Sequence, residues 1–432
     1  MHFNFALEHN QKNNNLIFDV SDDELLFYAQ IGTLPVIEEK VQAIKDALNY
    51  PIDCASLKDI VKGKNDVVII VDDLTRSTPQ EVILPIVLNE LNEAGILDSM
   101  ISVVIALGTH RPMTEQEILA RFGTEVVGRV KVLNHDAMES ECVDLGVTEK
   151  GTPIQINRLV YNSSVKIAIG TVVPHPLAGW GGGGKMVQPG VSSSLTTDQT
   201  HYLGGTYDKP LELVGNPENF IRREMEGIAK KVKVDFIINS VQDVHGNLVG
   251  IFAGDLISAH RSAVRCAEKI FRPLIPAPAD IVVVNAHPAD LDYWQGFKPF
   301  VFTQLAVKEG GAIVFYIEAR EGVSGGAPIH RQILLDWATQ EPEVIFAALE
   351  SGEIEDRNCG GICVSQAKLL KRARVFCISP GMTDDEIEKL GFTPVHSIEE
   401  GIAAARSVVR KQPQIGVIPF GGETIVMQRA GK

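Results

Sequence analysis

A glycine-rich segment that ends in a lysine is the most unusual feature of the sequence. Gly181–Gly184 are four consecutive glycines before Lys185, and His175 lies a few residues earlier between two prolines. Four glycines are costly in backbone entropy, so the run predicts that the backbone approaches a flat or bulky group closely, with Lys185 as the reactive or charged end. Gly179–Lys185 matches a P-loop only in part, because Met186 stands where a P-loop needs the hydroxyl that holds Mg²⁺.

A second candidate site follows the apolar run at residues 66–71. Two aspartates, the second of them Asp73, lead into the polar loop Thr75–Ser77 and then into a helix start. The pattern predicts Thr78 as the N-cap residue and Glu81 as the partner that closes a capping box. Free N–H groups and the helix dipole favour anions at such a terminus, so this loop is a candidate anion site.

A third segment, residues 106–117, repeats this arrangement. A strand runs into a polar loop that contains His110, and a helix follows with Thr114 and Glu117 in capping-box spacing. Ligand sites of open α/β sheets lie at the carboxyl ends of strands, which is where this loop begins. His110 is therefore a candidate general acid or base.

Other candidates lie further along the chain. His201 is in a helix-compatible segment, but the sequence contains no HxxxH, HExxH or paired CxxC pattern. Any metal would therefore take most of its ligands from something other than clustered side chains. Gln295 and Lys298 are three residues apart and would share one helix face, where an amide and an ammonium suit a carboxylate or keto oxygen. Cys359–Cys363 is predicted to be a loop.

The hydrophobic pattern around these candidates predicts an α/β fold. Short apolar, β-branched runs alternate with helical periodicity, which is typical of mainly parallel sheets buried on both faces and covered by helices. The predicted strands are residues 66–71, 101–106, 129–134, 165–170, 280–285 and 311–317. The predicted helices are residues 79–94, 114–121, 255–271 and 329–338, and residues 232–241 and 244–252 are predicted to pair as a hairpin.

The length of 432 residues predicts more than one domain. Residues 272–279 contain three prolines and are predicted to link two α/β domains with a cleft between them. Residues 1–271 would then carry the cofactor-binding and catalytic motifs, and residues 280–432 would supply groups that close over substrate. A last strand at residues 414–420 could return to either domain.

Composition limits the class of partner and the compartment. Forty basic and fifty-five acidic residues give a net charge of −15, which argues against a nucleic-acid or anionic-membrane binder. The six cysteines are scattered in neither a disulfide nor a zinc pattern, the N-terminus lacks a leader, and no apolar run reaches the roughly 18 residues of a membrane span. A cytoplasmic protein is expected.

Taken together, the motifs resemble the nickel-dependent lactate racemase family, whose members racemise or epimerise hydroxyacids with a nickel pincer nucleotide. The motifs that carry the resemblance occur in the family's order and span most of the chain: Asp73–Arg76, Gly108–Thr114, Pro174–His175, the glycine run to Lys185, His201, and Gln295 with Lys298.

The resemblance implies a role for each of these residues. Lys185 would hold pyridinium-3,5-bisthiocarboxylic acid mononucleotide nickel covalently, and His201 would be the protein ligand to nickel. His110 and His175 would be paired acid/base catalysts, while Arg76, Gln295 and Lys298 would contact the substrate. The other cofactor-binding residues would be Asp73, Thr75, Ser77, Gly182, Gly183 and Gly184. Cofactor-biosynthesis enzymes would be partners, and the substrate would be a small anionic 2-hydroxyacid.

The chemistry of a 2-hydroxyacid explains this set of groups. Its α-hydrogen is too weakly acidic for easy removal as a proton, whereas hydride transfer gives a planar keto acid that can take the hydride back on its other face. One base must accept the hydroxyl proton on each side, hence two histidines. A cationic pyridinium with nickel can accept the hydride, and the protein positions it.

Two alternatives remain open from the residues alone. Lys185 could form a Schiff base in a lyase or dehydratase that needs no nickel. A non-enzymatic module that binds anionic metabolites is the other, although three loops with His, Lys and Arg exceed what binding requires. The particular 2-hydroxyacid is also left open by the sequence.

Overall fold

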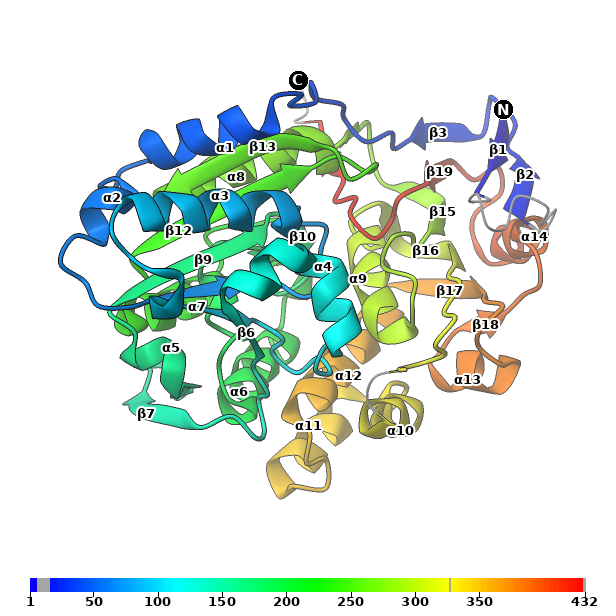
Figure 1. The fold of residues 1–432 in the computed structure, drawn as a ribbon. Helices are drawn as coiled ribbons and strands as arrows, with labels where there is room; N and C mark the ends of the chain where they lie inside the picture. The colour runs from blue at the N-terminus through cyan, green and yellow to red at the C-terminus, as the bar shows by residue number, and fades with distance from the viewer. Residues whose placement is uncertain (6–15, 326–327, 430–432) are drawn as a thin grey trace.

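Two six-stranded sheets lie side by side in the computed structural model, which describes residues 1–5, 16–325 and 328–429 (Figure 1). The first sheet has the order β13-β12-β9-β4-β5-β6 and is parallel except for β13. Its strands are β4 (Val67–Val71), β5 (Ile101–Ile105), β6 (Lys131–Asn134), β9 (Val165–Thr171), β12 (Phe236–Gln242) and β13 (Leu248–Gly254). The predicted strands and the predicted 232–252 hairpin are confirmed to within a few residues.

The second sheet is wholly parallel, with the order β18-β17-β16-β15-β19-β3. Its strands are β3 (Leu25–Tyr28), β15 (Ala279–Asn285), β16 (Val307–Tyr316), β17 (Ala373–Ile378), β18 (Thr393–Pro394) and β19 (Ile415–Ile418). Strands β4, β9, β12 and β15 are buried along their whole length, as expected for apolar runs covered by helices on both faces.

Helices cover both sheets and also fill the region between them. Those that precede residue 272 are α1 (Lys40–Asn49), α2 (Leu57–Ile60), α3 (Gln80–Glu93), α4 (Glu115–Arg129), α5 (Arg158–Asn162), α6 (Ser194–Gly205), α7 (Phe220–Val232) and α8 (Ser258–Phe271). The later ones are α9 (Tyr293–Thr303), α10 (Pro328–Trp337), α11 (Pro342–Ser351), α12 (Arg357–Leu370), α13 (Asp384–Lys389) and α14 (Ile398–Val408). The other strands of the described residues are short and form separate two-stranded sheets. These pairs are β1 (His2–Asn4) with β2 (Ile17–Asp19), β7 (Cys142–Val147) with β8 (Pro153–Asn157), β10 (Pro174–His175) with β11 (Gly179–Trp180), and β14 (Leu274–Ile275) with β20 (Met427–Gln428).

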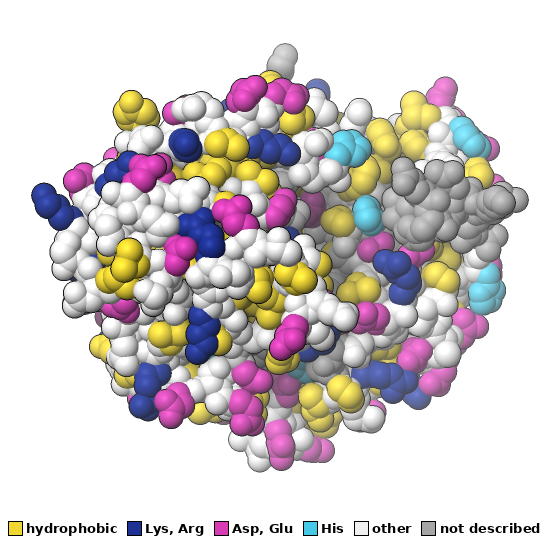
Figure 2. Space-filling view, in the orientation of Figure 1, with side chains coloured by type: hydrophobic (Ala, Val, Ile, Leu, Met, Phe, Trp, Pro, Cys, Tyr) yellow, Lys and Arg dark blue, Asp and Glu magenta, His cyan; other side chains and the backbone are white. Residues whose placement is uncertain are grey.

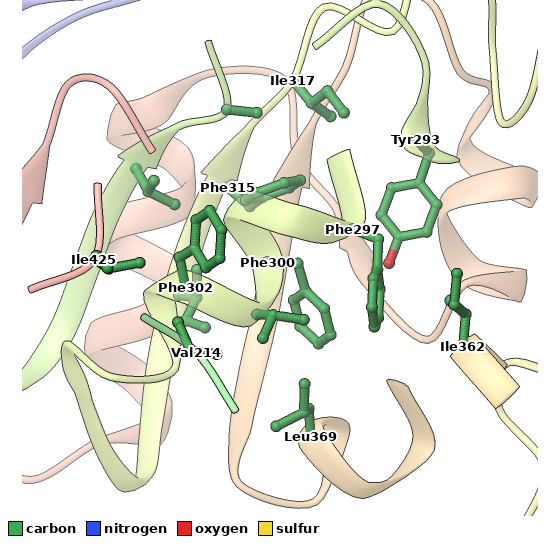
Figure 3. Packing of buried hydrophobic residues seen from close by; sticks show 14 of the residues in the cluster. Val214, Tyr293, Phe297, Phe300, Phe302, Phe315, Ile317, Ile362, Leu369 and Ile425 are labelled. Atoms are coloured by element: carbon green, nitrogen blue, oxygen red, sulfur yellow. The ribbon is translucent and has the colours of Figure 1, made fainter. Parts of the chain in front are cut away.

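Aromatic side chains of α9 form the centre of the largest core cluster (Figure 3). Phe300 and Phe302 pack there with Phe315 of β16, while Phe297 and Ile362 belong both to this core and to the wall of the main cavity. The part of the cavity wall formed by Phe297 and Ile362 is therefore continuous with the close-packed interior, and such packing resists movement of these side chains.

Segments near both ends of the chain form strand pairs that were not predicted from the sequence. Strand β3 joins the edge of the second sheet beside β19, and Phe3 and Phe18 pack against the same sheet. The proline-rich segment 272–279 contains β14, which pairs with β20 near the C-terminus. The last predicted strand, β19, belongs to the second sheet. The division of the chain at residues 272–279 stays a prediction.

The α12 helix corrects the prediction of a loop at Cys359–Cys363, since these residues lie within the helix. Gly360 and Gly361, typical of loops, are needed instead for close packing. A Cβ on Gly361 would lie 3.0 Å from the carbonyl oxygen of His201 on α6, and one on Gly360 would lie 2.5 Å from the side chain of Leu349 on α11. None of the helices in the described ranges is long and apolar enough to span a membrane.

Candidate active site

One cavity of about 570 Å³ lies between the carboxyl ends of β4, β5 and β9 and the first turns of α9 and α12. Most of the predicted site residues line it: Asp73, Thr75, Arg76, Ser77, His110, His175, Gly182, Lys185, His201, Gln295 and Lys298. These residues come from loops and helices spread over more than 200 positions of the chain. The fold thus gathers all three polar loops, the His201 helix and the Gln295/Lys298 helix at one place.

The loops after β4 and β5 meet through a hydrogen bond between Asp73 and His110. Oδ2 of Asp73 lies 2.6 Å from Nδ1 of His110, and Oδ1 accepts hydrogen bonds from the backbone and hydroxyl of Thr75. Burial alone would raise the pKa of Asp73, but His110, Arg76 and Thr75 hold that pKa below its usual range. The ionised carboxylate must accept from Nδ1, and a neutral His110 ring bound in this way carries its lone pair on Nε2.

Asp72 binds the Thr78 hydroxyl that was predicted to cap the helix after β4. Its carboxylate is buried and accepts hydrogen bonds from Gln80, Arg121 and the hydroxyl of Thr78. The Thr78 hydroxyl is therefore used by Asp72, and α3 begins after Pro79 with no side-chain cap. The capping box predicted from Thr78 and Glu81 is wrong, whereas the one from Thr114 to Glu117 on α4 is confirmed.

His175 is held in the opposite way to His110. Its Nδ1 accepts hydrogen bonds from the backbone N–H groups of Leu177 and Ala178, at 3.2 and 3.1 Å. A neutral His175 ring therefore carries its proton on Nε2. Burial, with a further contribution from the neighbouring basic side chains, lowers the pKa of His175 well below its usual value, so the ring is neutral near pH 7.

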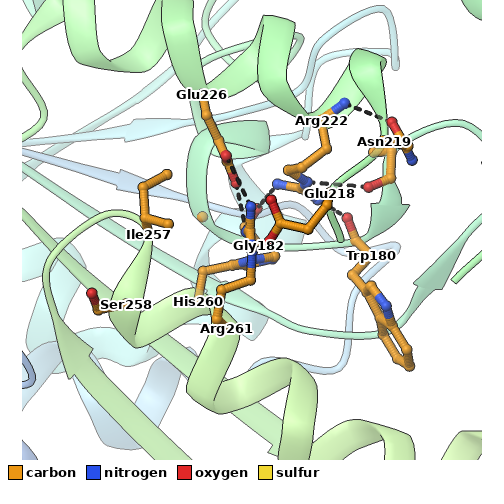
Figure 4. Close-up of polar contacts among 12 residues, drawn as sticks. Trp180, Gly182, Glu218, Asn219, Arg222, Glu226, Ile257, Ser258, His260 and Arg261 are labelled. Atoms are coloured by element: carbon orange, nitrogen blue, oxygen red, sulfur yellow. Dashed lines mark hydrogen bonds and ion pairs between the residues drawn. The ribbon is translucent and has the colours of Figure 1, made fainter. Parts of the chain in front are cut away.

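The glycine-rich loop is fixed by Arg222, a buried residue on α7 (Figure 4). Its guanidinium donates to the carbonyl oxygens of Ala178 and Gly182, each at 3.1 Å, and to that of Trp180. Nε2 of His260 lies 2.8 Å from another carbonyl of the same loop. Burial lowers the pKa of Arg222 to about 10, so it remains a cation at neutral pH. Arg222 lies in no recognisable motif, so its support of the loop could not be predicted from the sequence.

The glycines themselves pack mainly against protein. Gly182 and Gly183 have positive φ values of 65° and 56°. A Cβ on Gly182 would lie 2.5 Å from Oδ1 of Asn239, and one on Gly183 would lie 2.8 Å from the ring of His260. Gly182 lines the cavity, but Gly183 and Gly184 do not, so the structure gives no support to these two as cofactor-contacting residues.

Lys185 opens into the cavity as an amine with unusual properties. Its side-chain Nζ makes no hydrogen bond with a described residue, and burial together with Arg76 and Lys298 lowers the pKa of this amine well below the usual lysine value. A deprotonated amine is nucleophilic, so Lys185 is suited to forming a covalent bond with an acyl or carbonyl group.

His201 lies on α6 with one ring nitrogen free. Its Nδ1 is 2.9 Å from the carbonyl oxygen of Thr197 one turn earlier, so Nδ1 donates and Nε2 keeps a lone pair. Burial lowers the pKa of His201 to about 4, which keeps the ring neutral. Metal-binding histidines commonly donate their second nitrogen to a carbonyl in this way. Within the described ranges no three His, Cys, Asp or Glu residues are grouped for a metal, so His201 would be a lone protein ligand.

The first turn of α9 brings Gln295 and Lys298 to the cavity on one helix face, as predicted. Nζ of Lys298 donates to Oε1 of Gln295 at 2.6 Å. Burial and the neighbouring Arg76 lower the pKa of Lys298 to about 7. The Arg76 and Lys298 side chains thus make this part of the cavity electropositive and suited to a carboxylate.

Sequence reasoning missed two polar residues of the cavity wall, Glu423 near the C-terminus and Asn358 on α12. Glu423 follows Gly421 and Gly422 after β19, and burial raises its pKa to about 7. Neither residue lies in a motif, so only the three-dimensional structure could reveal them. Whereas Arg76 and Lys298 make part of the cavity electropositive, the outer face shown in Figure 2 has acidic and basic side chains interspersed.

Comparison with known proteins identifies the class of this fold and site. Two family models match the chain: the lactate racemase N-terminal domain over residues 12–210 and the lactate racemase C-terminal domain over residues 275–426. A lactate racemase from Thermoanaerobacterium thermosaccharolyticum is 29% identical over 425 residues, 96% of this chain and 98% of that protein. One from Lactiplantibacillus plantarum is 27% identical over 388 residues, 89% of this chain and 90% of that protein.

Solved structures agree with the sequence comparisons. The lactate racemase apoprotein from Thermoanaerobacterium thermosaccharolyticum matches with a TM-score of 0.84 and 28% identity, covering 95% of this chain and 97% of that one. A protein from Thermotoga maritima matches with a TM-score of 0.70 and 19% identity, covering 92% and 100%, which shows the fold alone. The protein is thus an isomerase of the racemase class. It belongs to the lactate racemase family.

Proposed function

We propose that this enzyme racemises or epimerises a small 2-hydroxycarboxylic acid, with a nickel pincer nucleotide attached to Lys185. The observation that carries the proposal is the convergence of a nucleophilic amine, two differently protonated histidines and a cationic carboxylate site in one cavity. Lactate, named for both relatives, is the first substrate to test.

The residues present fit the proposed cofactor. Lys185 offers a neutral amine that can be acylated, and His201 offers one ring nitrogen with its tautomer fixed by Thr197. A lone protein ligand is sufficient because the pincer itself would supply the other donor atoms. When bound, the cofactor would supply a hydride acceptor for the α-hydrogen of the substrate. Cofactor-biosynthesis enzymes would be needed as partners to load the protein.

The chain's own residues would bind the substrate and move its hydroxyl proton. Arg76 and Lys298 would hold the carboxylate, and the Gln295 side chain fixes the position of Lys298. Nε2 of His110 can accept the hydroxyl proton, since Asp73 holds Nδ1–H and stabilises the imidazolium that forms. His175 presents Nε2–H and would donate a hydrogen bond to the substrate oxygen, completing the proton path on the other side.

Production of the protein together with cofactor-making enzymes tests the proposal. The intact mass should exceed the sequence mass by one mononucleotide adduct that maps to the peptide with Lys185, and the loaded protein should racemise one or more 2-hydroxyacids. Lys185→Ala should lack adduct, nickel and activity while keeping the thermal unfolding temperature close to that of the parent. An active enzyme with an unmodified Lys185 would contradict the proposal.

A Schiff-base enzyme is the second candidate, and the lowered pKa of Lys185 is the observation that favours it. Borohydride reduction in the presence of a keto acid would trap such an adduct on Lys185. Trapping by protein that lacks nickel, together with lyase or dehydratase turnover, would replace the first proposal with this one.

A further inference from the structure

Asn358 is a polar group of the cavity wall without a partner in the protein. It is the second residue of α12, its side chain is 2% exposed, and it lines the main cavity. Oδ1 is fully buried without a hydrogen bond, and the described residues offer no partner to the other end of the amide either. A buried amide left unpaired is unfavourable, so its presence requires an explanation such as a bound ligand.

The helix start holds Asn358 firmly in this position. Asp356 caps α12 by accepting from the backbone of Cys359 at 2.9 Å, and it also pairs with Nε2 of His330 at 2.9 Å. The His330 ring stacks on Trp294, with ring centroids 4.1 Å apart, and Trp294 is the neighbour of Gln295. The position of Asn358 is thus coupled to the helix turn that carries substrate-binding groups, and its amide cannot easily turn towards bulk water.

The surroundings of Asn358 indicate which part of a ligand it meets. Ile362, one turn further along α12, lines the cavity, as do Phe297 and Leu177. Arg76 and Lys298, which would take the carboxylate, come from a different loop and helix. The carbon chain of the substrate is then left to the apolar wall, and Asn358 provides a hydrogen-bonding group there.

We infer that Asn358 is a specificity-determining residue that hydrogen-bonds a polar substituent at C3 of the substrate, so that the enzyme prefers 2-hydroxyacids with a C3 hydroxyl to those that end in a methyl group. This inference rests on the proposed function. A hydroxyl both donates and accepts, which matches an amide. A methyl group would leave the amide unpaired, and sites built to hydrogen-bond a substrate hydroxyl discriminate strongly against analogues that lack it.

Lactate and glycerate form the probe pair, because they differ only in the C3 hydroxyl. We would measure kcat/KM for both acids with the loaded parent enzyme, with Asn358→Leu, which is similar in size and apolar, and with Asn358→Ala as a second variant in case leucine disturbs packing. Gln332→Leu removes an exposed amide of α10 and serves as the matched control. Nickel content, intact adduct mass and calorimetric binding of each acid are measured alongside turnover.

The parent enzyme and the control should favour glycerate by about ten-fold or more, and the Asn358 variants should lose this preference while nickel and adduct stay unchanged. An equal preference in parent and variants would overturn the inference, and so would loss of nickel or adduct in the variants, since Asn358 would then serve the cofactor. A parent that racemises lactate without preferring glycerate contradicts the inference alone. A loaded parent that racemises other 2-hydroxyacids but neither of these two contradicts the inference alone, whereas one that racemises no 2-hydroxyacid contradicts the proposed function as well.

Discussion

Oδ2 of Asp73 lies 2.6 Å from Nδ1 of His110, and this contact joins the loop after β4 to the loop after β5. The carboxylate fixes the tautomer of the ring, because a group whose pKa is held below its usual range stays ionised and must accept the hydrogen bond. In its neutral form, His110 therefore carries its lone pair on Nε2, the nitrogen that does not face Asp73. His175, whose Nδ1 accepts from backbone N–H groups, has the opposite proton arrangement.

Replacing Asp73 with asparagine should lower turnover without removing the cofactor. The amide removes the negative charge that fixes the His110 tautomer and stabilises its cation, so kcat should fall by about 10²-fold or more, the usual contribution of general acid–base catalysis. Nickel content and adduct mass should remain at the parent values. Turnover close to that of the parent would show that the Asp73–His110 contact is not part of catalysis.

Nickel retention should separate His201 from the two proposed acid/base histidines. His201→Ala should lose nickel, because the free Nε2 on α6 is the proposed protein ligand, and it should keep the adduct on Lys185. His110→Ala and His175→Ala should keep nickel and lose turnover by about 10²-fold or more. Metal analysis and intact mass of the three purified variants test this assignment. Loss of nickel from His110→Ala with retention in His201→Ala would reverse the proposed roles.

Substrate binding should weaken as the pH rises through about 7. Lys298, with a pKa lowered to about 7, is charged below that pH and neutral above it. Glu423, with a pKa raised to about 7, is neutral below that pH and anionic above it. Both changes remove positive charge from a site for a carboxylate, so the Kd of an anionic 2-hydroxyacid should increase between pH 6 and 8.5.

Calorimetric titrations at several pH values would measure this dependence, and Glu423→Gln should make it shallower because one of the two titrating groups is gone. Lys298→Arg keeps a cation at every pH in the range and should likewise flatten the profile. A Kd that is constant from pH 6 to 8.5 in the parent enzyme would contradict the electrostatic description of the cavity.

Arg222 should be the most important single side chain for the stability of the glycine-rich loop. Arg222→Ala would leave three loop carbonyls without their buried donor, and each unmet group costs about 1–3 kcal/mol, so the free energy of unfolding should fall by about 3 kcal/mol or more. The adjacent Arg223 is exposed, and Arg223→Ala should change stability by only about 0.5 kcal/mol or less. Urea denaturation of both variants compares them directly, and similar losses would argue against the loop role of Arg222.

Elements with strong local signals could be predicted from the sequence. The buried strands were found because continuous β-branched runs such as Val67–Val71 have few alternatives, and the Thr114–Glu117 capping box is a local pattern. Predictions failed where a contact formed in the folded protein overrides the local preference. Asp72 takes the hydroxyl that Thr78 would have used as a cap, and Gly361 on α12 packs closely against α6, where a Cβ on Gly361 would lie 3.0 Å from the carbonyl oxygen of His201.

In the candidate site, too, some residues have local sequence signals and others are recognisable only in the folded structure. Residues in motifs could be proposed from sequence, since polar loops that follow parallel strands converge at one sheet edge. Asn358, Glu423 and Arg222 lie in no motif. Arg222 acts through hydrogen bonds to residues 40 to 44 positions earlier, Glu423 is notable for the burial that raises its pKa, and Asn358 for a buried amide oxygen without a partner. The pairing of β3 with β19 is similarly non-local and has no sequence signal.

The fate of the α-hydrogen tests the proposed racemisation by hydride transfer most directly. The loaded enzyme would interconvert the enantiomers of its substrate in D₂O, and mass spectrometry and proton NMR would follow the α-position while chiral chromatography follows inversion. If the hydrogen moves as hydride, inverted product should keep nearly all its α-protium, and substrate with α-deuterium should react more slowly and keep its label. Uptake of one solvent deuterium at the α-carbon with each inversion would contradict the account, because it would show removal and return of a proton by side-chain bases.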